Sequence, residues 1–171
     1  MRFKVSVLAL GVLALVSSSA LAADGPNAAA AFERLKGLVG EWEAVQANGQ
    51  KATSRFEVIA GGSALLERET GMGSEMITLY HLDGDRLLLT HYCMAGNQPR
   101  MRLTAFDPAT GELAFEFLDA TGLPNPAAGH MRRARFWLEA ANRYSTQWNF
   151  VENGKSTFDE KFKFARMGSG K

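Results

Sequence analysis

The sequence contains very little cysteine. Cys93 is the single cysteine in 171 residues, so no internal disulfide can form and a hydrophobic core must supply the stability. No CxxC pair or catalytic signature surrounds Cys93. We therefore interpret it as a small buried apolar residue rather than a reactive thiol.

Recognisable catalytic and metal-binding motifs are also lacking. The three histidines, His81, His91 and His130, form no recognisable metal-binding pattern with each other, with cysteine or with acids. HExxH, EF-hand, GxSxG, SxxK and Walker A patterns are missing as well. Motifs therefore assign no catalytic residue, no metal ligand and no cofactor, and whether the protein is an enzyme stays open.

Long apolar runs are confined to the N-terminus. Arg2 and Lys4 precede the 12-residue apolar run Val5–Val16, and Ala20-Leu21-Ala22 forms an A-x-A cleavage site. This pattern predicts a secretory signal over residues 1–22, and therefore an exported protein, periplasmic or secreted. Twelve residues are too few to span a bilayer, and no later run approaches the ~18 required, so no transmembrane segment is expected after signal removal.

Excess charge of one sign is lacking too. The signal carries two of the 19 Lys and Arg and none of the 18 Asp and Glu, which leaves 17 basic and 18 acidic residues, a net charge of −1. This balance excludes a strongly basic nucleic-acid binder and a polybasic membrane-surface protein. It leaves the oligomeric state undetermined.

The remaining chain predicts one domain over residues 23–166, followed by a disordered tail over 167–171. Ala28, Phe32, Leu35 and Val39 recur at helical spacing and predict a short helix over about 27–38. After it, runs rich in β-branched and aromatic residues alternate with turn residues. The expected strands are 41–46, 54–59, 64–70, 75–81, 86–92, 100–106, 112–118, 130–138, 143–151 and 156–164.

Nearly every connection between these strands has the length of a hairpin, which favours antiparallel neighbours. An open sheet of ten strands would expose long edges, and closure removes them. The predicted fold is therefore all-β: an up-and-down antiparallel barrel of about ten strands, with the short N-terminal helix covering one mouth. Alternation places aromatic residues on the inward faces of the last strands. A barrel of this size is wide enough to keep a cavity.

The motif Gly40-Glu41-Trp42 follows the helix directly. It resembles the G-x-W signature of lipocalin-like and wider calycin barrels, and the entry strand of nitrobindin-like and fatty-acid-binding-protein-like domains. With His91-Tyr92-Cys93 and the segment 96–101, the chain resembles exported bacterial lipocalin-like proteins of unknown function. The resemblance implies structural roles for Gly40 and Trp42, with Trp42 stacked under a basic residue of the last strand, here Lys163 or Arg166.

Nitrobindin-like barrels bind haem through a histidine near the C-terminus. The last histidine of this chain is His130, and the two final predicted strands contain none. The family's own route to haem is therefore not expected here. Haem held by His91 in a different geometry stays a minor alternative.

The segment around His91 holds the candidate ligand-binding residues. His91 and Tyr92 occupy opposite faces of a largely apolar strand, so at least one of them is expected in the lumen. Arg100 and Arg102 share a face on the next strand and could approach that pair, clamping a polar head group while the lumen holds an apolar tail. In the alternative interpretation, His91 and Tyr92 bond to the backbone and both arginines face water.

Three functions remain open. The first is a binding protein for a small hydrophobic or amphipathic molecule. The second is an acid–base enzyme in which His91 and Tyr92 carry protons and Arg100 holds an anion, which requires His91 and Arg100 to converge in one pocket. The third is a solid barrel that acts as an interaction module. Glu67 and Glu69 share a strand face but are not expected to form a buried catalytic dyad.

Overall fold

The computed structural model describes residues 26–46, 49–71 and 73–168. The expected signal over 1–22 and the end of the expected tail, 169–171, lie outside the described residues. In chain order the elements are α1 (Ala28–Lys36), β1 (Gly40–Val45), β2 (Lys51–Ile59), the short 3₁₀ helix η1 (Ala60–Gly62), β3 (Ala64–Thr70), β4 (Met76–Asp83), β5 (Arg86–Tyr92), β6 (Gln98–Asp107), β7 (Glu112–Thr121), β8 (His130–Ala140), β9 (Arg143–Glu152) and β10 (Lys155–Arg166). None of the helices in the described parts of the chain is long and apolar enough to cross a membrane.

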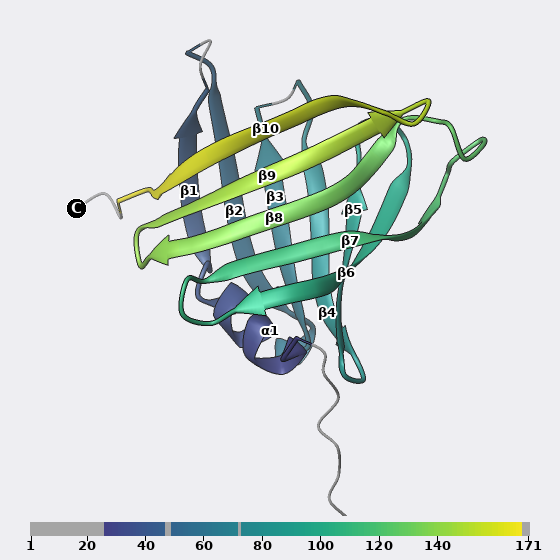
Figure 1. Ribbon diagram of the computed structural model, residues 1–171. Helices are drawn as coiled ribbons and strands as arrows, with labels where there is room; N and C mark the ends of the chain where they lie inside the picture. Colours follow the sequence, from purple (N-terminus) through teal and green to yellow (C-terminus); the bar gives the residue numbers. More distant parts are fainter. Residues whose placement is uncertain (1–25, 47–48, 72, 169–171) are drawn as a thin grey trace, which may run out of the picture.

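The ten strands form a closed antiparallel barrel (Figure 1). Each strand pairs with the next one along the chain, and β1 pairs with β10 to close the ring, with Trp42 opposite Arg166. This confirms the predicted up-and-down barrel with one short helix. Closure leaves no unpaired sheet edge, which is the physical reason that a meander of ten hairpin-linked strands adopts this form.

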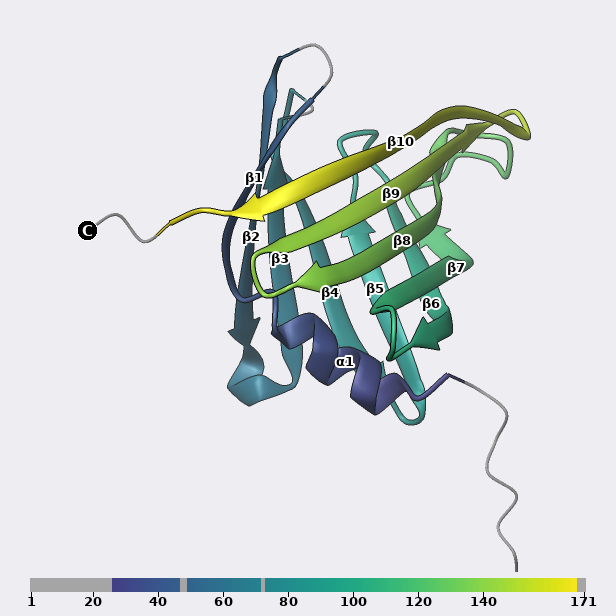
Figure 2. The ribbon, with the colours of Figure 1, turned by 60° about the vertical axis from the view of Figure 1, so that its left-hand side comes forward.

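Helix α1 lies across one end of the barrel (Figure 2). It begins at Asn27, whose side chain accepts a hydrogen bond from the backbone N–H of Ala30 at 3.0 Å. Its buried face includes Phe32 and Leu35, and the helix packs against β2, β4, β5 and β6. These are the strands whose connections at this end would otherwise expose the lumen, so the helix closes that mouth.

Trp42 anchors the closure between the first and last strands. Its ring is fully buried, its indole N–H donates to the Leu38 carbonyl at 2.7 Å, and the Arg166 guanidinium lies 4.1 Å from the ring centroid. Arg166, rather than Lys163, therefore fills the basic position that the sequence predicts. Gly40 has a φ of 127°, and a Cβ there would lie 2.6 Å from Arg166 Nη1, so this position requires glycine.

Side chains fill most of the lumen. The inward faces of β7, β9 and β10 carry the expected aromatic residues, and these rings make edge-on and stacked contacts with rings on neighbouring and next-but-one strands. The largest fully buried side chains are Trp42, Tyr80, Tyr144, Phe56, Phe115 and Phe136. The barrel is thus a packed core with limited free space, and what remains lies toward the end opposite α1.

Candidate functional site

The four residues expected to bind a ligand do not converge. His91 points into the lumen and is 2% exposed, whereas Tyr92, the next residue along β5, is 47% exposed. Arg100 and Arg102 are exposed as well, because Met101 and Leu103 take the inward face of β6. Of the proposed clamp, only His91 is inside.

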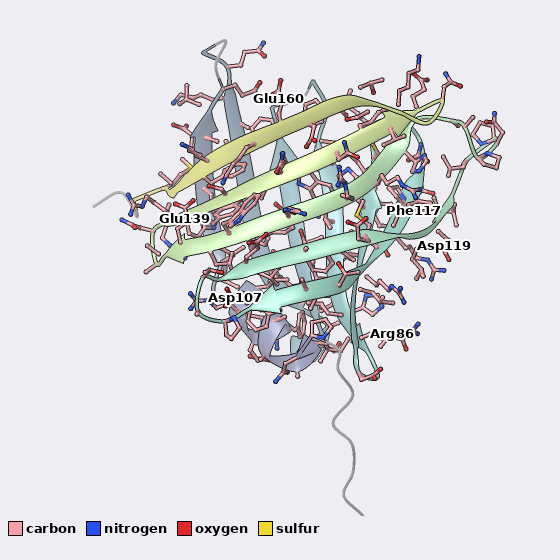
Figure 3. The ribbon with its side chains drawn as sticks, viewed as in Figure 1. Arg86, Asp107, Phe117, Asp119, Glu139 and Glu160 are labelled. Atoms are coloured by element: carbon pink, nitrogen blue, oxygen red, sulfur yellow. The ribbon has the colours of Figure 1, made fainter. Side chains whose placement is uncertain are left out.

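Arg100 has a different partner on the outer wall. Its guanidinium forms a two-pronged ion pair with the carboxylate of Asp119 on β7, with Nε donating to Oδ1 at 2.6 Å. Asp119 lies at the periphery of the barrel (Figure 3). His91 and Arg100 therefore do not share a pocket, and the arrangement required by the proposed acid–base mechanism with Arg100 as anion holder is not found.

A small cavity of about 20 Å³ lies in the lumen near the end opposite α1. Glu69, near the end of β3, His91, near the end of β5, and Trp148 of β9 border it, although nearly all of the wall that it exposes is apolar. The apolar wall consists of Met76, Met131, Phe158 and Phe162. A volume of this size holds about one water molecule.

His91 is tied to the barrel wall by one ring nitrogen only. Nδ1 is bonded to the hydroxyl of Thr78 on β4 at 2.9 Å, and the ring packs on Trp148 with centroids 4.8 Å apart. Burial lowers the pKa of His91 to about 4, so the imidazole is neutral at physiological pH. Nε2, the nitrogen farther from the backbone, has no hydrogen-bond partner within the described residues.

Three further buried polar groups of β9 are without a hydrogen-bond partner in the described part of the structure. They are the hydroxyls of Tyr144 and Thr146 and the indole N–H of Trp148. Buried polar atoms are normally paired, because losing water without gaining a partner costs free energy. The concentration of such atoms on the inner faces of β5 and β9 marks this part of the lumen as polar and unsatisfied.

Glu67 lies deeper in the barrel, with both carboxyl oxygens occupied. The Tyr80 hydroxyl donates to Oε2 at 2.6 Å, and the Ser54 hydroxyl donates to Oε1 at 2.9 Å. Burial raises the pKa of Glu67 to about 7, although these two hydrogen bonds act in the opposite direction. Burial also raises the pKa of the Tyr80 phenol, which stays a neutral donor.

Glu69 is the carboxyl group that borders the cavity. It is 7% exposed, and no hydrogen bond or ion pair to it is found among the described residues. Burial, and then the negative charge of Glu67, raise the pKa of Glu69 to about 8. The two acids are therefore a buried pair, contrary to the expectation from sequence. Within the described chain, no group of three His, Cys, Asp or Glu is placed to hold a metal ion.

Alternation alone could not have identified this acid pair. On β3, Leu65 shares one face with Glu67 and Glu69, while Leu66 shares the other with Arg68. Each face therefore combines a leucine with at least one charged residue, so alternation does not show which face is buried. The available signal lies on the neighbouring strand, where Thr78 and Tyr80 could supply hydrogen bonds to inward-facing acids.

Larger hollows exist, but on the outer surface. One of about 570 Å³ runs over β7, β8 and β9 and is bordered by Arg132 and Arg133. Most of its polar groups face water, although His130, which borders it, is 5% exposed and its Nε2 has no partner within the described residues. The cavity near His91 is the stronger candidate site, because two of the residues that border it, His91 and Trp148, each carry a buried polar atom without a partner in the described structure.

Cys93 directly follows the end of β5 and is 8% exposed. Burial raises the pKa of its thiol, which suppresses the reactive thiolate. We expect Cys93 to react with an aromatic disulfide reagent at least tenfold more slowly in the native protein than after unfolding in urea. Equal rates in the two states would contradict its placement.

Comparison with known proteins adds the fold but no function. No family model and no curated protein matches this chain. Among solved structures, the chain is similar to a protein of unknown function from the DUF3598 family of Nostoc punctiforme, with a TM-score of 0.54 and 11% sequence identity. The match covers 78% of this chain and 49% of that one, so the chain spans about half the length of its structural neighbour.

Proposed function

We propose that this chain is an exported, lipocalin-like barrel of the calycin type that binds a small amphipathic molecule at the end of the lumen opposite α1. The Gly40-Glu41-Trp42 motif, and the position of Trp42 beneath Arg166, support the calycin assignment. The apolar segment of residues 1–22, with its A-x-A site, supports export.

One observation carries the binding proposal. Glu69, His91 and Trp148 come from three different strands and meet at one cavity, and Nε2 of His91 and Nε1 of Trp148 are unpaired there within the described structure. Apolar side chains form the rest of the wall. Convergent polar groups within an apolar enclosure are typical of small-molecule sites, where the polar groups fix the orientation of the ligand.

The size of the cavity restricts the ligand. At about 20 Å³ it is far below the ~300 Å³ of a typical ligand pocket, so a long fatty acid does not fit without rearrangement. Met76 and Met131 border the cavity, and methionine side chains adopt several shapes at low cost. We therefore expect a short-tailed ligand that enters by displacing these two side chains.

Titration of the protein with hexanol, followed by NMR of the indole N–H groups, tests this proposal. The Trp148 resonance, assigned with Trp148→Phe, is expected to shift saturably, because the indole N–H faces the bound hydroxyl. The Trp42 resonance is expected to stay in place, because its N–H is bonded to Leu38. No shift, or equal shifts of all indole signals, would exclude the site.

A pair of methionine variants provides the control. Met131→Phe places a bulkier, stiffer side chain in the wall and narrows the cavity, so it is expected to weaken hexanol binding at least tenfold. Met94→Phe makes the same change at a position 56% exposed, near the same end of the barrel, and is expected to leave binding unchanged. Equal effects of the two variants would show that hexanol binds elsewhere.

A further inference from the structure

The charges inside the barrel are all of one sign. The buried ionisable side chains in the described residues include Glu67 and Glu69, whereas no lysine or arginine within those residues is buried. The arginines expected to clamp an anion face outward. A carboxylate ligand would therefore meet two buried acids and no cation, which is unfavourable in a low-dielectric interior.

Glu67 and Glu69 differ in their hydrogen-bond donors. Glu67 accepts from Ser54 and Tyr80 and is satisfied by the protein, whereas Glu69 borders the cavity without a donor from the described residues. A buried carboxylate needs a cation or hydrogen-bond donors to be stable in its charged form. The structure supplies the acceptor and leaves the donors to water or to a ligand.

His91 adds a second acceptor beside Glu69. When Nδ1 carries the ring proton, its N–H donates a hydrogen bond to the Thr78 hydroxyl and Nε2 presents a lone pair. The ring is neutral, so it does not repel a positive charge. Trp148, Phe158 and Phe162 border the same cavity with aromatic rings. Aromatic faces attract organic cations, most strongly in desolvated sites.

We infer, on the basis of the binding site proposed above, that the ligand of this cavity is a small organic cation, a primary alkylammonium ion whose N–H groups bond to the Glu69 carboxylate and to Nε2 of His91. Its alkyl chain lies against Met76, Met131 and the two phenylalanines. Binding breaks the O–H bond of the protonated Glu69 carboxyl, and the proton is released to water, so the ammonium–carboxylate pair forms with charge balanced.

This coupling makes binding depend on pH. Glu69 faces Glu67 on its own strand, Tyr80 on β4, His91 on β5 and Tyr144 on β9. Burial keeps both phenols protonated and His91 neutral, so the two acids are the groups that titrate near neutrality. Affinity for the ammonium ion is expected to rise between pH 6.5 and 8.5 as Glu69 becomes easier to ionise.

Calorimetric titration of the protein with hexylamine, hexanol and hexanoate at pH 8.5 tests the inference. Hexylammonium is expected to bind at least tenfold more tightly than hexanol, with hexanoate weakest. A repeat at pH 7, where Glu69 is still protonated, is expected to show proton release in buffers of different ionisation enthalpy. Glu69→Gln should remove the preference for the amine and keep hexanol binding. The matched control, Glu160→Gln, changes an exposed acid on β10 and should keep the preference.

The outcomes separate this inference from the proposed function. Hexanol binding at Trp148 with no preference for hexylamine leaves the binding site standing and overturns the cation assignment. A preference for hexanoate, or an amine preference that survives in Glu69→Gln, also overturns it. Absence of binding by all three probes removes the proposed site itself.

Discussion

Replacing Trp42 by alanine is expected to lower the free energy of unfolding by about 3–5 kcal/mol. The ring is fully buried and meets Tyr144 edge-on, with centroids 4.8 Å apart. Its removal leaves a cavity at the seam between β1 and β10, takes away the hydrogen bond to the Leu38 carbonyl, and exposes the underside of the Arg166 guanidinium. These losses act on the one strand pair that closes the barrel.

Urea denaturation measures this effect through the midpoint, with the slope checked to confirm that the unfolding transition is unchanged. Trp137→Ala is the matched control, because Trp137 is half-buried and contacts Lys161 on the outer wall. We expect it to cost less than about 1 kcal/mol, in line with substitutions away from the core. A Trp42→Ala midpoint indistinguishable from that of the control would refute the structural role of Trp42.

Arg166 explains why the seam is specific. Its Nη1 donates to the Val39 carbonyl at 2.7 Å and its Nε to the Ala141 carbonyl at 2.9 Å, in addition to covering Trp42. One side chain from the last strand thereby joins the segment before β1 to the β8–β9 turn. Arg166 and not Lys163 occupies the position because Arg166 lies opposite Trp42 in the strand register, whereas Lys163 lies opposite Ser145 and is exposed. The planar guanidinium supplies the several donors that these contacts use.

The fold was predictable because local patterns agree with closure. The helix predicted over about 27–38 is observed at Ala28–Lys36, and all ten strands appear near their expected ranges. The largest differences are at β2, which begins at Lys51 and not at 54, and at β7, which ends at Thr121 and not at 118. The longer β7 pairs with the start of β6, where Gln98 lies opposite Thr121. Hairpin-length connections fix the strand order, and alternation fixes most faces.

The candidate site was less predictable, because its chemistry violates the usual preference for exposing charge. The expectation that His91 or Tyr92 faces the lumen holds for His91. Arg100 and Arg102 face outward, because the apolar side chains of Met101 and Leu103 take the inner face of β6. Glu69 is inside because one face of β3 must point into the lumen, and that face is the one that carries Leu65, Glu67 and Glu69. Burying an acid is costly, so sequence patterns favour the opposite assignment.

The buried acids are expected to make the protein less stable as pH rises from 6.5 to 8.5. Their folded-state pKa values are raised above the ordinary value of 4.5. Their stabilising contribution is therefore complete below about pH 4.5 and is lost as pH rises through their folded pKa values. His91 acts in the opposite direction below pH 6.5, because its folded pKa is lowered, and it is neutral in both states above that pH. Between pH 6.5 and 8.5 the acids therefore dominate, with a loss on the order of 2 kcal/mol.

Glu69→Gln is expected to flatten this decline and to make the protein more stable than wild type at pH 8.5. Each unit by which burial raises a pKa corresponds to about 1.4 kcal/mol of stability lost when the group ionises. The glutamine amide does not ionise, but burying it also costs free energy, so the free energy of unfolding is expected to rise by about 2–4 kcal/mol. Urea midpoints at pH 6.5 and 8.5 measure the change, with Glu160→Gln as the exposed control. A Glu69→Gln variant whose stability falls in parallel with wild type would show that Glu69 ionises as freely in the folded barrel as in the unfolded chain. The polar end of the lumen would then be open to water, and the same result would remove the reason for a bound cation to displace a proton.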